Sequence, residues 1–136
     1  MTTTTIPRLL TYRRVATRDQ QTSDTSLDAQ KEALTQLAAR LGIPIVIDFV
    51  EIASGAARGG AQRVAQARLL DAIQPGDVVA VSTLDRLARD STLALRNVGR
   101  ILNKGARFIS LAEGEFCSSP DGTPKLATFA ALAPKA

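Results

Sequence analysis

Apolar residues alternate along the chain between short runs and longer amphipathic segments. Four runs rich in β-branched and aromatic residues predict strands over 8–15, 43–52, 77–83 and 106–113. The segments between them have helical composition and predict helices over 27–42, 63–73 and 84–105. Residues 114–124 are predicted to form a loop, and residue 125 to begin a last helix. This order of elements predicts a three-layer α/β fold, in which helices flank a mostly parallel central sheet.

The length and composition of the chain are those of one globular domain. We expect residues 1–136 to form a single domain, because this length can bury a core of its own. Apolar residues make up 45% of the chain and charged residues 22%, which is ordinary for globular proteins. The apolar runs are too short to span a bilayer, and the first residues lack the apolar core of a signal peptide. The sequence thus predicts a cytoplasmic protein that does not associate with membranes.

The absence of histidine narrows the possible chemistry. Without histidine the chain cannot form a Ser-His triad or the usual zinc sites. The single cysteine, Cys117, excludes an intrachain disulfide and a cysteine-based metal cage, and we interpret it as an incidental small residue. Any reaction must therefore use hydroxyl, carboxylate, lysine or arginine side chains.

The basic residues are mostly arginines. Thirteen arginines and four lysines make up the 17 basic residues, and the net charge is +4. A guanidinium group is planar and permanently charged, and it can bind one phosphate through two hydrogen bonds. This composition is compatible with a polyanionic partner. A GC-rich genome would produce the same arginine usage, so only the positions of the arginines can distinguish these two interpretations.

Arginines lie where predicted strands end and helices begin, which is where ligands bind in open α/β sheets. Arg14 lies near the end of the first strand and, by strand alternation, shares a face with Tyr12 and Ala16. Arg63 opens the second helix, after the glycine-rich stretch at 53–62. An exposed arginine at such a place is often inert, so neither position by itself indicates a site.

The segment LDRLARDS, residues 84–91, has the sharpest pattern in the chain. On a helical turn Asp85 and Arg89 would lie four residues apart and face each other, with Arg86 on another side of the turn. One interpretation is a capped helix with a solvated salt bridge, which is common. The other is a pair of guanidiniums that orient one phosphodiester, with Asp85 positioning one of them.

Four segments occur in an informative order and cover almost the entire chain. They are YRRVATRDQ with SLDAQ, EIASGAARGGAQR, QPGDVVAVSTLDRLARDS, and FISLAEGEF with SPDG and FAALA. Together they resemble the catalytic domain of the serine recombinases, the resolvase and invertase family of enzymes that cut and rejoin DNA. The block GDVVAVSTLDRLARDS is highly specific, and the ordered combination is more so.

The resemblance implies a mechanism without a metal or other cofactor, because arginines supply the positive charge that magnesium gives elsewhere. In the family, a serine at the end of the first strand attacks a DNA phosphodiester and becomes joined to the 5′ phosphate. The matching residue here is Ala16. The resemblance assigns stabilisation of the transition state to Arg14, Arg63, Arg86 and Arg89, and orientation of an arginine to Asp85. Positions that support the site or contact DNA phosphates are matched by Tyr12, Gln20, Gln30, Glu51, Ser54 and Ser91.

Ala16 departs from the family pattern, because a methyl group cannot act as a nucleophile. We therefore expect this chain to be inactive in the family reaction. Three explanations are possible: an introduced serine-to-alanine change, a naturally inactive paralogue, and a neighbouring hydroxyl, Thr17 or Ser23, that replaces the serine. The replacement is the least favoured, since Thr17 is predicted to point to the opposite face of the strand from residue 16.

The sequence is thus interpreted as a site-specific DNA recombinase catalytic domain for DNA recombination or integration. The resemblance implies DNA as partner and, in the full-length protein, homodimers that pair into tetramers. We expect residues 1–136 to end before the long dimerisation helix and the DNA-binding domain of the family, so that self-association is weak and DNA sequence is read elsewhere. The alternative is a non-catalytic module that binds DNA or assembles with recombinases. A third interpretation, a nucleotide-binding α/β domain, has less support than these two, because the glycine pattern does not match such a domain well.

Overall fold

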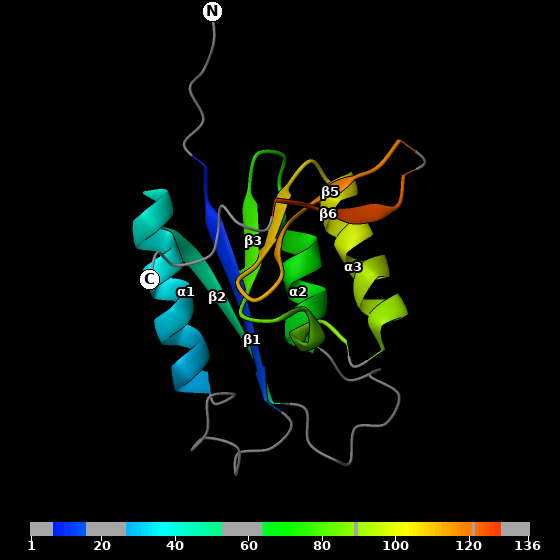
Figure 1. Ribbon diagram of the computed structural model, residues 1–136. Helices are drawn as coiled ribbons and strands as arrows, with labels where there is room; N and C mark the ends of the chain where they lie inside the picture. Colours follow the sequence, from blue (N-terminus) through cyan, green and yellow to red (C-terminus); the bar gives the residue numbers. More distant parts are fainter. Residues whose placement is uncertain (1–6, 16–26, 53–63, 89, 121, 129–136) are drawn as a thin grey trace, which may run out of the picture.

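The computed structural model describes residues 7–15, 27–52, 64–88, 90–120 and 122–128. Six strands form one sheet in the order β2-β1-β3-β4-β5-β6 (Figure 1). Their bounds are β1 Leu9–Val15, β2 Ile45–Ile52, β3 Val78–Val81, β4 Arg107–Ser110, β5 Gly114–Ser118 and β6 Pro124–Thr128. Strands β1 to β4 pair in parallel, whereas β5 and β6 are antiparallel to their neighbours. The predicted mostly parallel sheet is confirmed.

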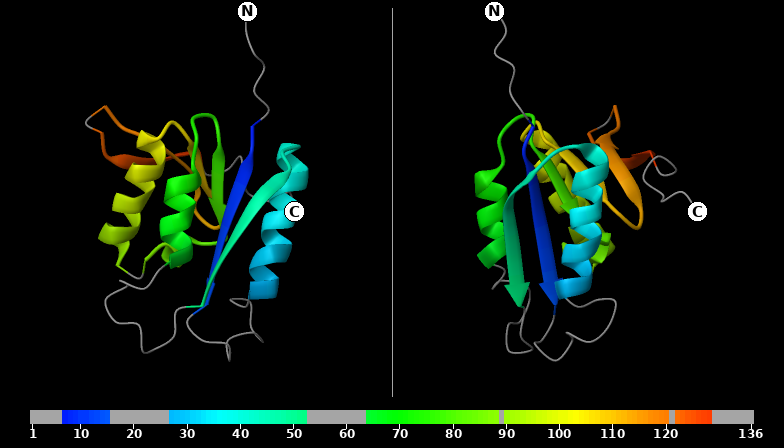
Figure 2. Two further views of the ribbon diagram at one scale, coloured as in Figure 1. Left: turned by 180° about the vertical axis from the view of Figure 1, so that it is seen from behind. Right: turned by 90° about the vertical axis from the view of Figure 1, so that its left-hand side faces the viewer.

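Helices cover both faces of this sheet. Helix α1, Leu27–Leu41, lies on one face, and helices α2, Val64–Ala72, and α3, Ser91–Asn103, lie on the other (Figure 2). A single turn of 3-10 helix, η3, Leu84–Arg86, lies between β3 and α3. The predicted three-layer α/β fold is therefore confirmed. Among the helices that the structure describes, none combines the length and the apolar character that a membrane span requires.

Strand β1 is buried along its whole length and divides its side chains between the two faces. Leu9 packs in a cluster with Leu34 of α1, whereas Leu10 packs in the cluster that contains residues of α2 and α3. Burial of each such side chain stabilises the fold by about 1.5–3 kcal/mol. Because side chains alternate along a strand, Arg13 and Arg14 leave β1 on opposite faces.

The chain turns from α1 toward β2 at Gly42. Its φ of +70° is a left-handed conformation that residues with a side chain rarely adopt. The N–H groups of Gly42 and Ile43 both donate to the carbonyl of Ala38, at 2.9 and 3.2 Å. These bonds satisfy a carbonyl that the helix end would leave without a partner, and they direct the chain into the strand that pairs with β1.

The C-terminal part of the described chain differs from the prediction. Instead of a loop over 114–124 and a helix from 125, β5 pairs with β4 and β6 pairs with β5. The rings of Phe108 and Phe116 meet edge to face, with centroids 5.8 Å apart, and Arg107 donates to the carboxylate of Glu115 at 2.8 and 2.9 Å. Cross-strand partners rather than local propensity thus determine these strands. The remainder of the predicted last helix, 129–133, lies outside the described residues.

The predicted helix over 84–105 is wrong in its first part, because η3 ends and α3 begins only at Ser91. Asp90 has an extended backbone, with φ −78° and ψ 122°, and its carboxylate accepts from the N–H of Thr92 at 2.9 Å. Asp90 therefore caps α3 and separates it from η3. The α-helical pairing predicted for Asp85 and Arg89 has no continuous helix to support it, and Arg89 lies outside the described residues.

Candidate active site

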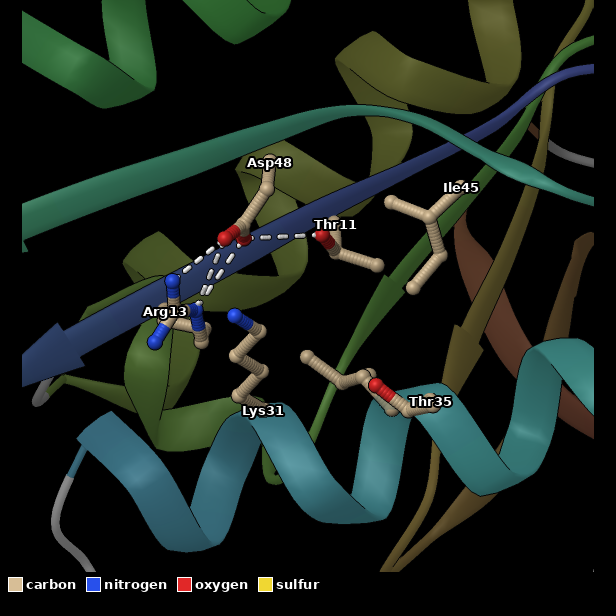
Figure 3. Close-up of a pocket in the computed structure, with 7 residues that line it drawn as sticks. Thr11, Arg13, Lys31, Thr35, Ile45 and Asp48 are labelled. Carbon is tan, nitrogen blue, oxygen red and sulfur yellow. Dashed lines mark hydrogen bonds and ion pairs between the residues drawn. The ribbon is translucent and has the colours of Figure 1, made fainter.

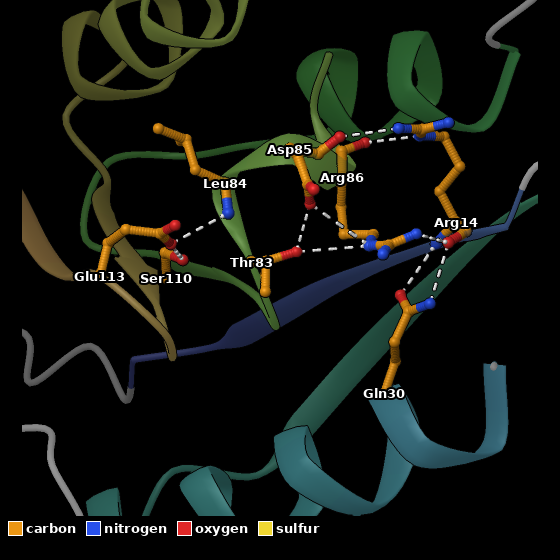
Figure 4. Close-up of polar contacts among 8 residues, drawn as sticks. All are labelled: Arg14, Gln30, Thr83, Leu84, Asp85, Arg86, Ser110 and Glu113. Atoms are coloured by element: carbon orange, nitrogen blue, oxygen red, sulfur yellow. Dashed lines mark hydrogen bonds and ion pairs between the residues drawn. The ribbon is translucent and has the colours of Figure 1, made fainter. Parts of the chain in front are cut away.

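The structure brings together Arg14 of β1 and Arg86 of η3. Arg14 donates from Nε to the carbonyl of Arg86 at 2.8 Å and from Nη2 to the carbonyl of Asp85 at 2.7 Å. Arg86 donates in return from Nη1 to the carbonyl of Arg14 at 2.9 Å. Figure 4 shows the two side chains running in opposite directions, so that each reaches the main chain of the other. The pair lies at the edge of the sheet where β1 and β3 end.

The short length of η3 explains why Arg14 binds it. A 3-10 helix of one turn leaves its last carbonyl groups without partners in the helix. The carbonyls of Asp85 and Arg86 accept from Arg14 instead, since the rigid fork of a guanidinium can donate to two neighbouring oxygens. Arg14 thereby fastens η3 to the end of β1.

The two arginines place positive charge where water has little access. Arg14 is 5% exposed, and the side chain of Arg86 is 13% exposed. The carboxylate of Asp85 is 66% exposed, lies 3.6 Å from Nε of Arg86 and accepts from the hydroxyl of Thr83. Among the described residues, the arginine that pairs with the Asp85 carboxylate is therefore Arg86. Charges shielded in this way interact more strongly with an anion than charges in bulk water.

Gln30 of α1 fixes the backbone of β1 at Arg14. Its Oε1 accepts from the Arg14 N–H at 3.0 Å, and its Nε2 donates to the Arg14 carbonyl at 2.8 Å. Gln30 is almost fully buried, so both bonds are protected from water. This predicted supporting residue lies against the arginine pair from the α1 side of the sheet.

Glu51 of β2 holds the start of α2. Its carboxylate accepts from the hydroxyl of Tyr12 at 3.0 Å and from the N–H groups of Ala65 and Gln66 at 3.2 and 3.0 Å. A carboxylate at the start of a helix binds N–H groups that have no partner within the helix. Glu51, which also accepts from Tyr12, thus stabilises the first described turn of α2, and both are residues predicted to support the site.

Of the other predicted site residues, one lies on the exposed surface and five lie outside the residues that the structure describes. Ser91 is exposed as the first residue of α3, where Asp90 provides the cap. The residues outside the described ranges are Ala16, Gln20, Ser54, Arg63 and Arg89. Their predicted roles stay predictions.

Glu113 is a residue of the site that sequence reasoning missed. Its Oε1 accepts from the N–H of Leu84 at 3.0 Å and from the hydroxyl of Ser110. It therefore fixes the first residue of η3, while Arg14 fixes the last carbonyls (Figure 4). The available signal was its position as the last residue of the predicted fourth strand, 106–113, at the same edge of the sheet as Arg14.

A cavity of about 250 Å³ lies on the α1 face of the sheet, beside Arg13 rather than Arg14 (Figure 3). Its lining residues are Thr11, Arg13, Lys31, Leu34, Thr35, Ile45 and Asp48. Arg13 donates to both oxygens of Asp48 and, from Nη1, to the carbonyl of Leu27 at 3.0 Å. Asp48 pairs with Arg13, and Lys31 adds a second positive charge to the lining, so this cavity has a mixed set of charges rather than two neighbouring arginines.

The comparison with known families identifies the class of protein. Residues 9–134 match the family described as Resolvase, N terminal domain, and the chain belongs to that family. Its fold is that of a serine recombinase catalytic domain, which confirms the family resemblance seen in the sequence. No curated protein matches the sequence.

Solved structures agree with this assignment. The N-terminal catalytic domain of TP901-1 integrase is 28% identical, with a TM-score of 0.62 over 76% of each chain. The C-terminal catalytic domain of ISC1926 TnpA, an IS607-like serine recombinase, is 25% identical, with a TM-score of 0.59 over 79% of this chain and 71% of that one. A resolvase family site-specific recombinase from Streptococcus pneumoniae is 20% identical, with a TM-score of 0.60 over 93% and 80%, and shares the fold.

Proposed function

We propose that this chain is a site-specific DNA recombinase catalytic domain that binds a DNA phosphodiester without cleaving it. In this proposal Arg14 and Arg86 bind the phosphate. Ala16, which follows the last residue of β1 in the sequence, offers no nucleophile. Arg63 and Arg89 are proposed to complete the set of phosphate-binding arginines, as the family resemblance implies.

The observation that best supports the proposal is the reciprocal bonding of Arg14 and Arg86 to each other's main chain. These bonds hold both guanidiniums in place before a ligand arrives, so binding requires little reorganisation. Among the described residues, no acceptor binds Nη2 of Arg86, which leaves this N–H₂ group available to a phosphate oxygen. Two fixed cations at one sheet edge suit a phosphodiester, whose charge is spread over two oxygens.

The absence of an oxygen at position 16 separates binding from cleavage. In the reaction that the resemblance implies, the serine hydroxyl loses its proton as its oxygen bonds to phosphorus, the bond from phosphorus to the 3′ oxygen breaks, and a proton is transferred to the 3′ oxygen. Ala16 cannot form the first of these bonds, so the DNA strand stays intact. Binding of the phosphodiester needs only charge and hydrogen bonds, which the arginines still supply.

Salt-dependent binding of duplex DNA to the full-length protein tests this proposal. We expect Arg86→Ala to weaken binding by about tenfold for any DNA sequence and to reduce the slope of log K against log salt by about one. Arg86→Lys keeps the charge but not the fork, so it should lie between Arg86→Ala and the parent. The control is Arg100→Ala, on the exposed surface of α3, which should bind as the parent does. A parent protein that does not bind DNA, or equal losses in the Arg86 and Arg100 variants, would contradict the proposal.

A further inference from the structure

Two amide side chains are buried between α2 and α3. Gln66 is 7% exposed and Asn97 is 5% exposed. They lie on the buried faces of these helices, where their neighbours along the same faces include Leu69 and Val98. Burying an amide costs free energy unless its polar atoms find partners, so such a pair needs a compensating network.

Their hydrogen bonds form a chain that ends at the arginine-bearing segment. Nδ2 of Asn97 donates to Oε1 of Gln66 at 2.9 Å, and Nε2 of Gln66 donates to the carbonyl of Leu87 at 2.9 Å. The bond from Asn97 holds the Gln66 amide in the orientation that directs its N–H₂ group toward Leu87. The backbone N–H of Gln66 is held in turn by Glu51 at 3.0 Å.

Leu87 is the third of three successive residues whose carbonyls are bound by side chains from other elements. Arg14 binds the carbonyls of Asp85 and Arg86, and Gln66 binds that of Leu87. Leu87 is itself buried, so removal of Gln66 would leave a buried carbonyl without its hydrogen-bond donor. The end of η3 is thus held from the β1 side by Arg14 and from the α2 side by Gln66.

An apolar pair could replace the hydrogen bond between Gln66 and Asn97, but it would leave the buried carbonyl of Leu87 without its donor. Replacing both partners of a buried hydrogen bond by apolar groups of similar shape is often neutral or stabilising. What the amides add is direction, since only a donor aimed at Leu87 fixes the backbone next to Arg86. From this geometry we infer that Gln66 and Asn97 are positioning residues, which hold η3 so that Arg86 stays in reach of Arg14 and the bound phosphate.

This inference rests on the proposed function for the role of Arg86, but its structural part can be tested separately. Asn97→Leu and Gln66→Met keep the approximate volume of each side chain and remove the donor. In the full-length protein we expect each variant to stay folded but to melt several degrees below the parent, with amide exchange over 84–88 about tenfold faster. DNA affinity should fall by about three- to tenfold. The matched control is Asn103→Leu, at an exposed position of α3, which should change neither exchange nor affinity.

The double variant distinguishes positioning from general packing. If Asn97 acts through Gln66, Gln66→Met with Asn97→Leu should weaken DNA binding no more than Gln66→Met alone, whereas independent packing effects would add. Unchanged exchange over 84–88 and unchanged DNA affinity in both single variants, with a parent that binds DNA, would overturn the inference. If the variants exchange faster over 84–88, the positioning of η3 is supported. If the parent also fails to bind DNA, the proposed function is contradicted, but the positioning of η3 is not.

Discussion

Gln30 bonds to both backbone polar groups of Arg14, accepting from its N–H at 3.0 Å and donating to its carbonyl at 2.8 Å. The same carbonyl also accepts from Nη1 of Arg86. One glutamine on α1 therefore holds the residue at which the two arginines meet. The position of the site depends on helix α1 as much as on the strands that carry the charges.

Replacement of Gln30 by leucine should destabilise the fold by about 1–3 kcal/mol, because the buried N–H of Arg14 loses this acceptor and the carbonyl of Arg14 loses one of its donors. Chemical denaturation monitored by circular dichroism measures this loss. The matched control is Gln36→Leu on the same helix, where the side chain is exposed and bonds only to exposed Glu32 among the described residues. Equal stability of the Gln30 and Gln36 variants would show that the Arg14 backbone does not depend on Gln30.

Glu113 should hold the backbone of Leu84, the first residue of η3, in place through a hydrogen bond. Glu113→Ala removes the acceptor for the N–H of Leu84, so we expect faster amide exchange at Leu84 and a loss of stability of about 1–2 kcal/mol. Glu113→Gln keeps an oxygen at the same place and should restore most of the protection. If the glutamine variant exchanges as fast as the alanine variant, the hydrogen bond to Leu84 is not what orders η3.

The ion pair between Arg8 and Asp77 should make stability depend on pH. Arg8 donates to the Asp77 carboxylate at 2.9 and 2.7 Å, and the N–H of Gln74 donates to it at 2.8 Å. Burial acts to raise the pKa of Asp77, but the hydrogen bonds from Arg8 and Gln74 and the charge of Arg8 outweigh it, so the pKa lies below its ordinary value. A carboxyl group with a lowered pKa stabilises the fold above its ordinary pKa, and this contribution is lost as the pH falls through the lowered value.

Asp77→Asn should therefore cost about 1–3 kcal/mol at neutral pH, and the difference from the parent should shrink as the pH falls below about 4. Urea denaturation at a series of pH values measures the difference. Asp71→Asn, on the exposed surface of α2, is the control and should track the parent throughout. A difference for Asp77→Asn that stays constant down to the lowest pH would contradict the assigned ion pair.

The sequence predicted the order of the central elements and the sheet edge at which Arg14 and Arg86 meet. The buried pattern of β1 and the position of LDRLARDS after β3 were enough to bring Arg14 and Arg86 to one sheet edge. The same information could not locate β5, because its sequence GEFCS has little strand propensity. The contact of Phe116 with Phe108 of β4 stabilises this strand instead. Such cross-strand contacts are not visible in a local pattern.

The details of the site depended on contacts between distant residues. Asp90 looks like an ordinary position within a helical stretch until its carboxylate accepts from Thr92 and ends the continuity with η3. Gln66 and Asn97 are typical of the polar face of a helix, yet both are buried. Their roles come from tertiary partners 21 and 31 residues away in the chain, which periodicity does not reveal.

The most direct test of the central claim is covalent trapping of labelled DNA that carries the protein's own recombination site. The assay compares full-length protein in the Ala16 and Ala16→Ser forms. If the arginine site is intact and only the nucleophile is missing, the Ala16→Ser protein should form a protein-DNA adduct and the Ala16 protein should form none. Adding Arg86→Ala to the Ala16→Ser form should abolish the adduct or reduce it strongly. An adduct with the Ala16 form would reveal another nucleophile, such as Thr17 or Ser23. The absence of an adduct in both forms, with DNA binding confirmed, would contradict the claim that one residue silences an otherwise complete site.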